Sequence, residues 1–287
     1  MALDGFSMDY WQPAPALAGL VSGYHRYVVR APAGQTHRDV FFPAWANLRI
    51  KLPGEPWTVR LAATTYPIDG AVLFGATSHA GFSESGAGAV IGAGITPLGW
   101  SRLTGLPASR FADRVTPLGE VLGGDLSALA RLNGEADPTP VLDRFFLDRM
   151  RVRRSDEARI VAMHEFLARG SADTVAQAAV RLGVSARRFN DLSNHVFGFG
   201  PKLLLRRARF LESLMELASD SPLPDSARIS AGYHDHSHFI RDAHEFLGMS
   251  PREFLKMRRP MNAASMTKRT AVLGAPAQAL LKPRAAA

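Results

Sequence analysis

The sequence predicts an α+β protein of two domains. An N-terminal antiparallel β barrel or sandwich with helices is followed by an all-α domain of two helix-turn-helix units joined by a long helix. Three observations support this prediction: apolar residues alternate with period two between residues 40 and 103, they recur at helical spacing beyond residue 151, and one helical pattern occurs twice. A chain of 287 residues is long enough for two domains. We place the boundaries at 1–150 and 151–260, and residues 261–287 follow as a separate segment.

Short strands between turn signals indicate the β-rich part. Leu48–Leu52 and Trp57–Leu61 each alternate apolar and polar residues, and Pro53-Gly54 ends the first of them. Ala71–Phe74 and Ala89–Ile91 have the continuous apolar character of buried strands. Leucines and other apolar residues then recur at helical spacing from Leu118 to Leu132, interrupted by Gly123-Gly124, and from Leu142 to Met150. This pattern predicts a sheet layer followed by a helical pair, whose apolar surface could serve a homodimer contact.

Charge is distributed unevenly along the chain. Residues 1–150 carry 12 Lys and Arg against 13 Asp and Glu, and residues 151–260 carry 18 against 13. Residues 261–287 have four basic and no acidic residues and lack amphipathic order, so we expect a flexible basic tail there. The basic C-terminal half favours a polyanionic partner, although a solvated cationic surface would have the same composition. No cysteine is present, which excludes disulfides and thiolate metal sites.

A helix-turn-helix pattern occurs twice in the basic half. The first copy is Val175–Ser185, a helix with small Ala179 four residues before Gly183 and a Ser185 N-cap, followed by a second helix over Ala186–Phe197. The turn glycine recurs at Gly232, and a long helix around Leu203–Leu217 lies between the copies. Two such units on one rigid helix could enter successive major grooves of B-DNA.

The second copy has the clearer outward face. Its helix from Asp235 to Leu247 places Phe239, Ala243 and Phe246 on one apolar side, Gly248 ends it, and Ser250-Pro251 begins the next helix. Outward polar residues on the two reading helices are the candidates for contacts with base edges: Arg187, Arg188, Asn190, Asp191, Asn194, His236, Ser237 and Arg241. Candidate phosphate contacts are Ser185, Lys202, Arg206 and Arg207.

Residues 159–259 resemble the C-terminal DNA-binding domain of the AraC/XylS family of bacterial transcription regulators. The resemblance is carried by Gly232-Tyr233, Asp235, Ser237-His238-Phe239 and Arg241, and by the exit Gly248-Met249-Ser250-Pro251 with Phe254. It implies double-stranded DNA as partner, RNA polymerase as a possible second one, a sensory or dimerisation domain at the N-terminus, and a partly buried His238 that reaches a phosphate. Arg228, where the first unit has Ala179, and Ser193, where the family buries a large aromatic residue, depart from the pattern.

Other interpretations of the same residues were weighed. His234, His236 and His238 are candidate metal ligands, but three imidazoles with this spacing on a helix cannot all point toward one ion. His25, His37 and His79 lack metal-site spacing, so we expect no cofactor, no metal and no catalytic residue. The alternative to a pure regulator is a DNA-associated protein whose N-terminal domain is an independent small-molecule-binding module or enzyme. A small effector, of unknown identity, would occupy the apolar barrel interior. Without a signal peptide or membrane span, we expect the cytoplasm.

Overall fold

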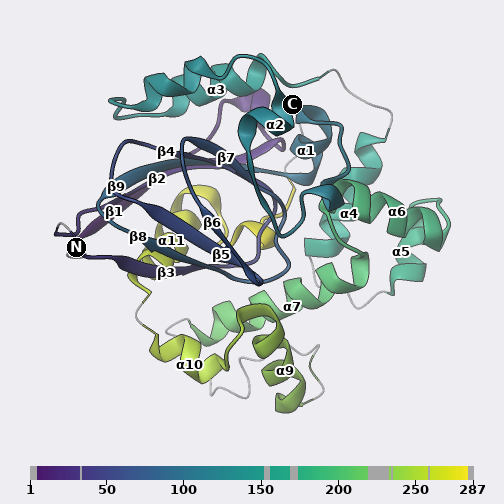
Figure 1. The fold of residues 1–287 in the computed structure, drawn as a ribbon. Coiled ribbons are helices and arrows are strands. Elements are labelled where there is room, and N and C mark those ends of the chain that lie inside the picture. The colour runs from purple at the N-terminus through teal and green to yellow at the C-terminus, as the bar shows by residue number, and fades with distance from the viewer. Residues whose placement is uncertain are drawn as a thin grey trace.

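Two antiparallel sheets form the N-terminal half of the computed structural model (Figure 1), which describes residues 5–32, 34–151, 156–168, 174–218, 233, 235–257 and 259–283. The first sheet has the strand order β1-β2-β9-β4-β7-β10, and the second has the order β3-β8-β5-β6. The strands are β1 (Phe6–Trp11), β2 (Val21–Val29), β3 (His37–Phe41), β4 (Asn47–Lys51), β5 (Trp57–Leu61), β6 (Thr64–Pro67), β7 (Ala71–Phe74), β8 (Gly81–Ser85), β9 (Gly88–Ile95) and β10 (Val115–Pro117). The predicted antiparallel β architecture is therefore confirmed.

Helices make up the rest of the described chain. They are α1 (Pro97–Leu103), α2 (Leu118–Leu122), α3 (Thr139–Leu147), α4 (Glu157–Ala168), α5 (Val175–Arg181), α6 (Ala186–Phe197), α7 (Pro201–Leu217), α9 (His236–Leu247), α10 (Pro251–Lys256) and α11 (Pro260–Leu273). Short 3-10 turns are η1 (Pro15–Leu17), η2 (Ala108–Arg110), η3 (Ser127–Leu132) and η4 (Gln278–Leu280). No helix in these described ranges is both long enough and apolar enough to cross a membrane.

The six-stranded sheet is covered on both faces. One face packs on the second sheet through a core that includes Tyr27, Trp57 and Phe74. The opposite face packs on the helical layer, and there the Tyr24 hydroxyl donates to Asp143 Oδ1 of α3 over 2.7 Å. Because both faces are covered, a polar residue within β4 can also be removed from solvent. Arg49 of β4 is buried in this way, with 9% of its surface exposed.

The helix-turn-helix part shares its apolar cores with the sheets. Phe189 and Val196 of α6 belong to the same core as Leu48 of β4, and Phe246 of α9 belongs to a core with Val40 of β3. The backbone N–H of Ala80 also donates to the Phe246 carbonyl over 2.7 Å. Figure 1 shows α4, α5 and α6 at one end of the sheets and α7, α9 and α10 beneath them. The two halves therefore contact one another extensively, and the expected boundary near residue 150 remains a prediction.

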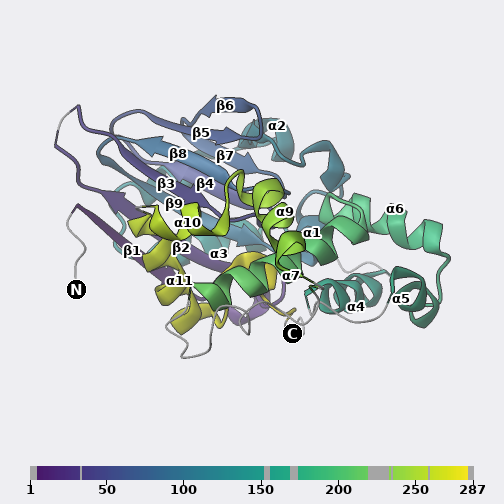
Figure 2. The same ribbon diagram turned by 90° about the horizontal axis from the view of Figure 1, so that it is seen from below.

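The expectation of a flexible tail is wrong for residues 261–283. These residues form most of α11, then η4, and α11 lies beside β1 and β3 (Figure 2). Its anchors are mostly polar: Tyr10 and Ser265 share a hydrogen bond of 2.6 Å, and Lys268 pairs with Asp9 over 3.1 Å. Gly23 of β2 allows Leu273 to approach so closely that a Cβ at this position would clash with it. Polar contacts of this kind produce no amphipathic period in the sequence. The sequence pattern therefore did not predict a packed helix for residues 261–283.

Candidate nucleic-acid interface and a buried pocket

The first helix-turn-helix unit forms as its local signals predict. Gly183 adopts a φ of +64°, a left-handed conformation that favours glycine, and Ser185 Oγ accepts from the Arg188 N–H over 3.1 Å at the start of α6. Ala179 is buried, which allows α5 to cross α6 closely. The buried Ser193 hydroxyl donates to the Phe199 carbonyl over 2.7 Å. A serine at this position is therefore satisfied by the exit loop.

The outward face of α6 carries the predicted base-reading residues. Phe189, Leu192 and Val196 are buried on the inner side. On the outer side Arg187, Arg188, Asn190 and Asp191 are exposed, and Asn194 is half-buried with its side-chain amide donating to the Asn190 carbonyl over 2.9 Å. The helix thus has one packed side and one polar side that is free to meet a groove.

The second reading helix, α9, has the same two-sided organisation. Asp235 caps it by accepting from the His238 N–H over 2.8 Å, and Phe239, Ala243 and Phe246 pack inward. The exposed side carries His236, Ser237, His238, Ile240 and Arg241. His238 is therefore exposed, in contrast to the partly buried position that the family resemblance implied. Gly232, His234 and Arg228 of this unit lie outside the described residues.

Arg207 is not available to a phosphate, so its assignment as a phosphate contact is wrong in this structure. Its side chain points from α7 into the N-terminal half, only 1% exposed, and donates to the Thr77 carbonyl over 2.7 Å. Its guanidinium lies 4.3 Å from the Trp45 ring centroid. Burial lowers the pKa of Arg207 to about 9, an effect that Asp113 partly opposes, so the side chain remains charged at neutral pH. Helical periodicity alone could not show which side of α7 faces the sheets.

Arg206, the neighbouring candidate, links α7 to α9. Its Nη2 donates to Asp242 Oδ1 over 2.5 Å and to Glu245 Oε2 over 2.7 Å, and 38% of its side chain is exposed. Hydrogen bonds to these two carboxylates raise the pKa of Arg206. Asp242 is 3% exposed and also accepts from the Tyr233 hydroxyl over 2.7 Å. Arg206 therefore positions α9 on α7, and its assignment as a phosphate contact remains a prediction. The remaining phosphate candidates Ser185, Lys202 and His238 are exposed.

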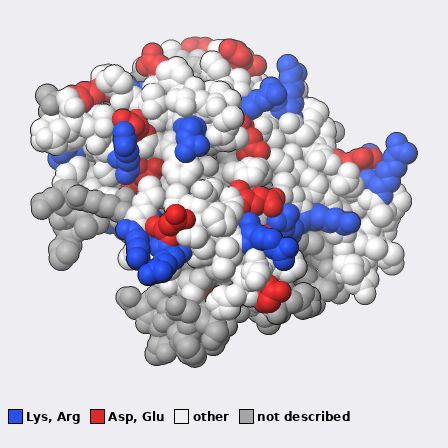
Figure 3. All heavy atoms as spheres, turned by 60° about the horizontal axis from the view of Figure 1, so that its bottom comes forward, with Lys and Arg blue, Asp and Glu red and all other residues white. Residues whose placement is uncertain are grey.

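Helix α7 lies between α6 and α9 in the chain, and its 17 residues span about 25 Å. Figure 3 shows the side of the molecule that carries α7, α9 and α10. Over the described atoms of this view, Lys and Arg are interspersed with Asp and Glu and do not form a continuous basic surface. Binding to a polyanion would therefore depend on individual side chains, in particular those of the outward helix faces.

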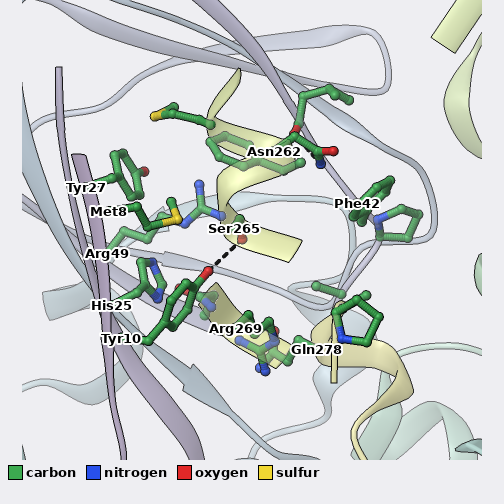
Figure 4. Close-up of a pocket in the computed structure, with 18 residues that line it drawn as sticks. Met8, Tyr10, His25, Tyr27, Phe42, Arg49, Asn262, Ser265, Arg269 and Gln278 are labelled. Atoms are coloured by element: carbon green, nitrogen blue, oxygen red, sulfur yellow. Dashed lines mark hydrogen bonds between the residues drawn. The ribbon is translucent and has the colours of Figure 1, made fainter. Parts of the chain in front are cut away.

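A pocket of about 100 Å³ lies in the N-terminal half, between strands β1, β2 and β4 and the C-terminal helix α11 (Figure 4). Arg49 and Arg269 line it, together with His25, Tyr27 and Tyr10. Burial lowers the pKa of His25 well below its ordinary value, and the charges of Arg49 and Arg269 lower it further. Sequence patterns do not point to these two arginines, because Arg49 occupies a polar position in a strand that alternates with period two, and residues 261–287 lack amphipathic order. Elsewhere in the described ranges, no three His, Asp or Glu side chains gather as a metal site would require.

The C-terminal part is defined by a domain match: residues 178–257 match the family described as "Helix-turn-helix domain". This match confirms the predicted helix-turn-helix domain in this part of the chain, the kind of domain by which transcription regulators bind DNA. It covers both α6 and α9 and the helix between them.

Three solved structures are similar to this chain at low sequence identity. ToxT from Vibrio cholerae O395 is 10% identical, with a TM-score of 0.46, over 88% of this chain and 98% of that one. Unsaturated fatty acid-bound ToxT from V. cholerae strain SCE256 is 13% identical, with a TM-score of 0.42, over 89% and 96%. The AraC-like transcriptional activator CuxR is 15% identical, with a TM-score of 0.34, over 73% and 82%. No curated protein sequence matches the chain.

Proposed function

We propose that this chain is a sequence-specific DNA-binding transcription regulator that inserts α6 and α9 into successive major grooves, and whose N-terminal half modulates that binding. The observation that carries the proposal is the pairing of two exposed polar helices on one rigid helix, α7, within the matched helix-turn-helix region. Each helix buries phenylalanines on one side and presents hydrogen-bonding side chains on the other. This is the arrangement that direct readout of base edges requires.

The outward side chains match the chemistry of base edges. The guanidinium groups of Arg187 and Arg241 can donate two hydrogen bonds to the O6 and N7 atoms of guanine, and Asn190 can pair with adenine. Asp191 can accept from the cytosine amine. Ile240, which is 41% exposed on α9, adds an apolar contact suited to a thymine methyl group. Arg188, Asn194, His236 and Ser237 complete the proposed base-reading set.

Phosphate contacts would position this reading surface. Ser185, Lys202 and His238 are exposed beside the two helices, and Lys202 lies at the start of α7. Binding that neutralises phosphates releases counterions, so we expect the association constant to fall steeply as salt rises. The proposed homodimer contact would use the helical layer around α3, where Leu147 is 45% exposed. RNA polymerase is a further proposed partner.

The test uses the full-length protein and a randomised duplex library, from which bound sequences are selected and read. Arg187→Ala and His236→Ala should each weaken binding to the selected site by about 1–3 kcal/mol and relax preference at one base pair. Arg38→Ala is the matched control, because Arg38 is an exposed arginine on β3, outside α6, α9 and the helical layer around α3, that pairs with Glu84 over 3.0 Å. Its affinity and sequence preference should equal those of the wild type.

The same selection also defines failure. If the wild type enriches no sequence from the library, the chain is not a sequence-specific DNA-binding protein. If it enriches a site that both Arg187→Ala and His236→Ala bind with unchanged preference, then α6 and α9 do not read bases through the residues that we name.

A further inference from the structure

The pocket between the strands and α11 contains two buried guanidinium groups without matching carboxylates. Arg49 projects from β4 and Arg269 from α11, and Figure 4 shows the two side chains entering the pocket from these different elements. They are 9% and 7% exposed. Nε and Nη1 of Arg49, and Nε and Nη2 of Arg269, have no hydrogen-bond partner. Four N–H-bearing nitrogen atoms are therefore buried without an acceptor.

Aromatic rings stabilise the charge of Arg49 but not its N–H groups. Its guanidinium carbon lies 4.0 Å from the Phe41 ring centroid and 4.3 Å from that of Phe74. Rings stacked on a guanidinium contact its flat faces, whereas its N–H bonds point outward in the plane. Buried donors of a charged group that lack acceptors cost several kcal/mol relative to solvent. Among the described residues, Nε and Nη1 of this guanidinium therefore remain without an acceptor, and an oxygen ligand could supply one.

The nearby carboxylate of Asp39 is already occupied. Its Oδ1 accepts from the N–H groups of Val40 and Asn262 over 2.8 and 3.2 Å, and its Oδ2 accepts from the Met261 N–H over 2.7 Å. Oδ2 also lies 3.3 Å from His37 Nε2. Asp39 thus holds the start of α11 against β3. Among the residues that the structure describes, no carboxylate forms an ion pair with Arg49 or Arg269.

We propose that this pocket binds a small organic carboxylate, whose oxygens accept from Arg49 and Arg269 and whose apolar body lies against the aromatic wall. A guanidinium binds a planar carboxylate through two parallel hydrogen bonds, which supplies the acceptors that the pocket lacks. Met8, Phe41 and Phe42 provide the apolar lining. A cavity of roughly 150 Å³ holds benzene, so a pocket of about 100 Å³ limits the body to a short aliphatic chain.

The inference rests on the proposed function in one respect, since it names the ligand through which the N-terminal half modulates DNA binding. Only three residues separate α11 from α10, whose Ser250 cap begins the last helix of the helix-turn-helix region. A carboxylate between Arg49 and Arg269 would tie α11 to the sheet. It would thereby fix the point at which the chain leaves the DNA-binding part.

The test measures thermal unfolding of the full-length protein in Tris chloride at constant ionic strength. The probes are acetate, propionate and butyrate, with butyramide as the neutral analogue of butyrate and inorganic phosphate as the alternative anion. At a concentration a hundredfold above its dissociation constant, the best carboxylate should raise the Tm by roughly 5 °C or more. Butyramide and phosphate should leave the Tm unchanged.

Variants assign the effect to the pocket. Arg49→Met and Arg269→Met should each weaken carboxylate binding tenfold or more, because each removes charged donors. Arg60→Met is the matched control, since Arg60 of β5 also stacks on a ring, at 4.6 Å from the Phe82 centroid, but is exposed and outside the pocket. Arg269→Lys keeps the charge without the planar fork, so it remains informative if a methionine variant does not fold.

Three results would overturn the proposal: no carboxylate raises the Tm of the wild type, phosphate or butyramide raises it as much, or both pocket variants retain wild-type affinity. DNA binding is measured on the same preparations. If no carboxylate binds in the pocket while sequence-specific DNA binding is intact, only the inference of a carboxylate site is refuted. Loss of sequence-specific DNA binding with intact carboxylate binding removes the proposed function and leaves the pocket as a ligand site.

Discussion

Arg207 provides a sharp test of how the DNA-binding part is attached to the sheets. We predict that Arg207→Met leaves the free energy of unfolding within about 1 kcal/mol of the wild type, or raises it, whereas Arg207→Ala lowers it by about 2–5 kcal/mol. Methionine fills most of the space of the arginine side chain without its charge. Alanine leaves a cavity at the contact between α7 and the loops that contain Ala44 and Thr77.

The magnitude follows from the surroundings of the guanidinium. Burial lowers the pKa of Arg207 to about 9, from an ordinary value near 12.5, which corresponds to roughly 5 kcal/mol of lost stabilisation for the charged form. The hydrogen bond to the Thr77 carbonyl stabilises the charged form by about 1.5–3 kcal/mol, and stacking on Trp45 stabilises it by about 2 kcal/mol. The sum is close to zero, so the charge itself contributes little and the filled volume contributes most.

The assay is urea unfolding at neutral pH, followed by tryptophan fluorescence and far-UV circular dichroism. Coincident transitions from the two signals justify a two-state treatment, and an unchanged slope with urea shows that only stability has altered. If Arg207→Met is destabilised as much as Arg207→Ala, the reasoning fails. The hydrogen bond to Thr77 would then outweigh the cost of burying the charge.

Two further predictions concern His164 and Arg206. Burial, and then the charge of Arg207, lower the pKa of His164 to about 4. The unfolded chain therefore takes up a proton between about pH 6.5 and pH 4 that the folded chain does not, and unfolding should become easier by about 3 kcal/mol as pH falls through this window. His164→Gln should flatten that part of the urea stability profile; an unchanged slope would contradict the assignment. Arg206→Met should cost about 1–3 kcal/mol by leaving buried Asp242 with Tyr233 alone, and Asp242→Asn in the same chain should restore most of it. Additive losses in that double-mutant cycle would show that the two residues are not coupled.

Local signals in the sequence determined the helix-turn-helix units. Gly183 at the turn, Ser185 and Ser250 at helix starts and Gly248 at a helix end all occupy the positions that their chemistry predicted. Each of these features depends on a backbone dihedral or on a hydrogen bond within four residues along the chain. The inward position of Phe239 and the outward position of Arg187 follow from the same helical period. The interactions involved are short in sequence, so the sequence alone is sufficient to predict them.

Strand alternation predicted the elements but not their surroundings. Arg49 and Arg60 occupy equivalent polar positions in two alternating strands, β4 and β5. Arg60 is exposed as expected, whereas Arg49 is buried, because β4 is central in a sheet with both faces covered. Strand β2 was not predicted, although its nine residues pair with β1 on one side and β9 on the other in the same sheet as β4. A period-two pattern predicts which residues share a face of a strand. Whether that face is exposed to solvent depends on the element that packs against it.

The tertiary structure alone decided the position of α11, the burial of Arg207 and the pocket between Arg49 and Arg269. Residues 49 and 269 are separated by most of the chain, and they meet because Asp39 and Tyr10 hold α11 against the strands. The outward surfaces of α6 and α9 could be predicted from sequence because a helix determines its own faces. A site assembled from a strand and a distant helix could not, because its geometry is set by contacts between segments that share no local pattern.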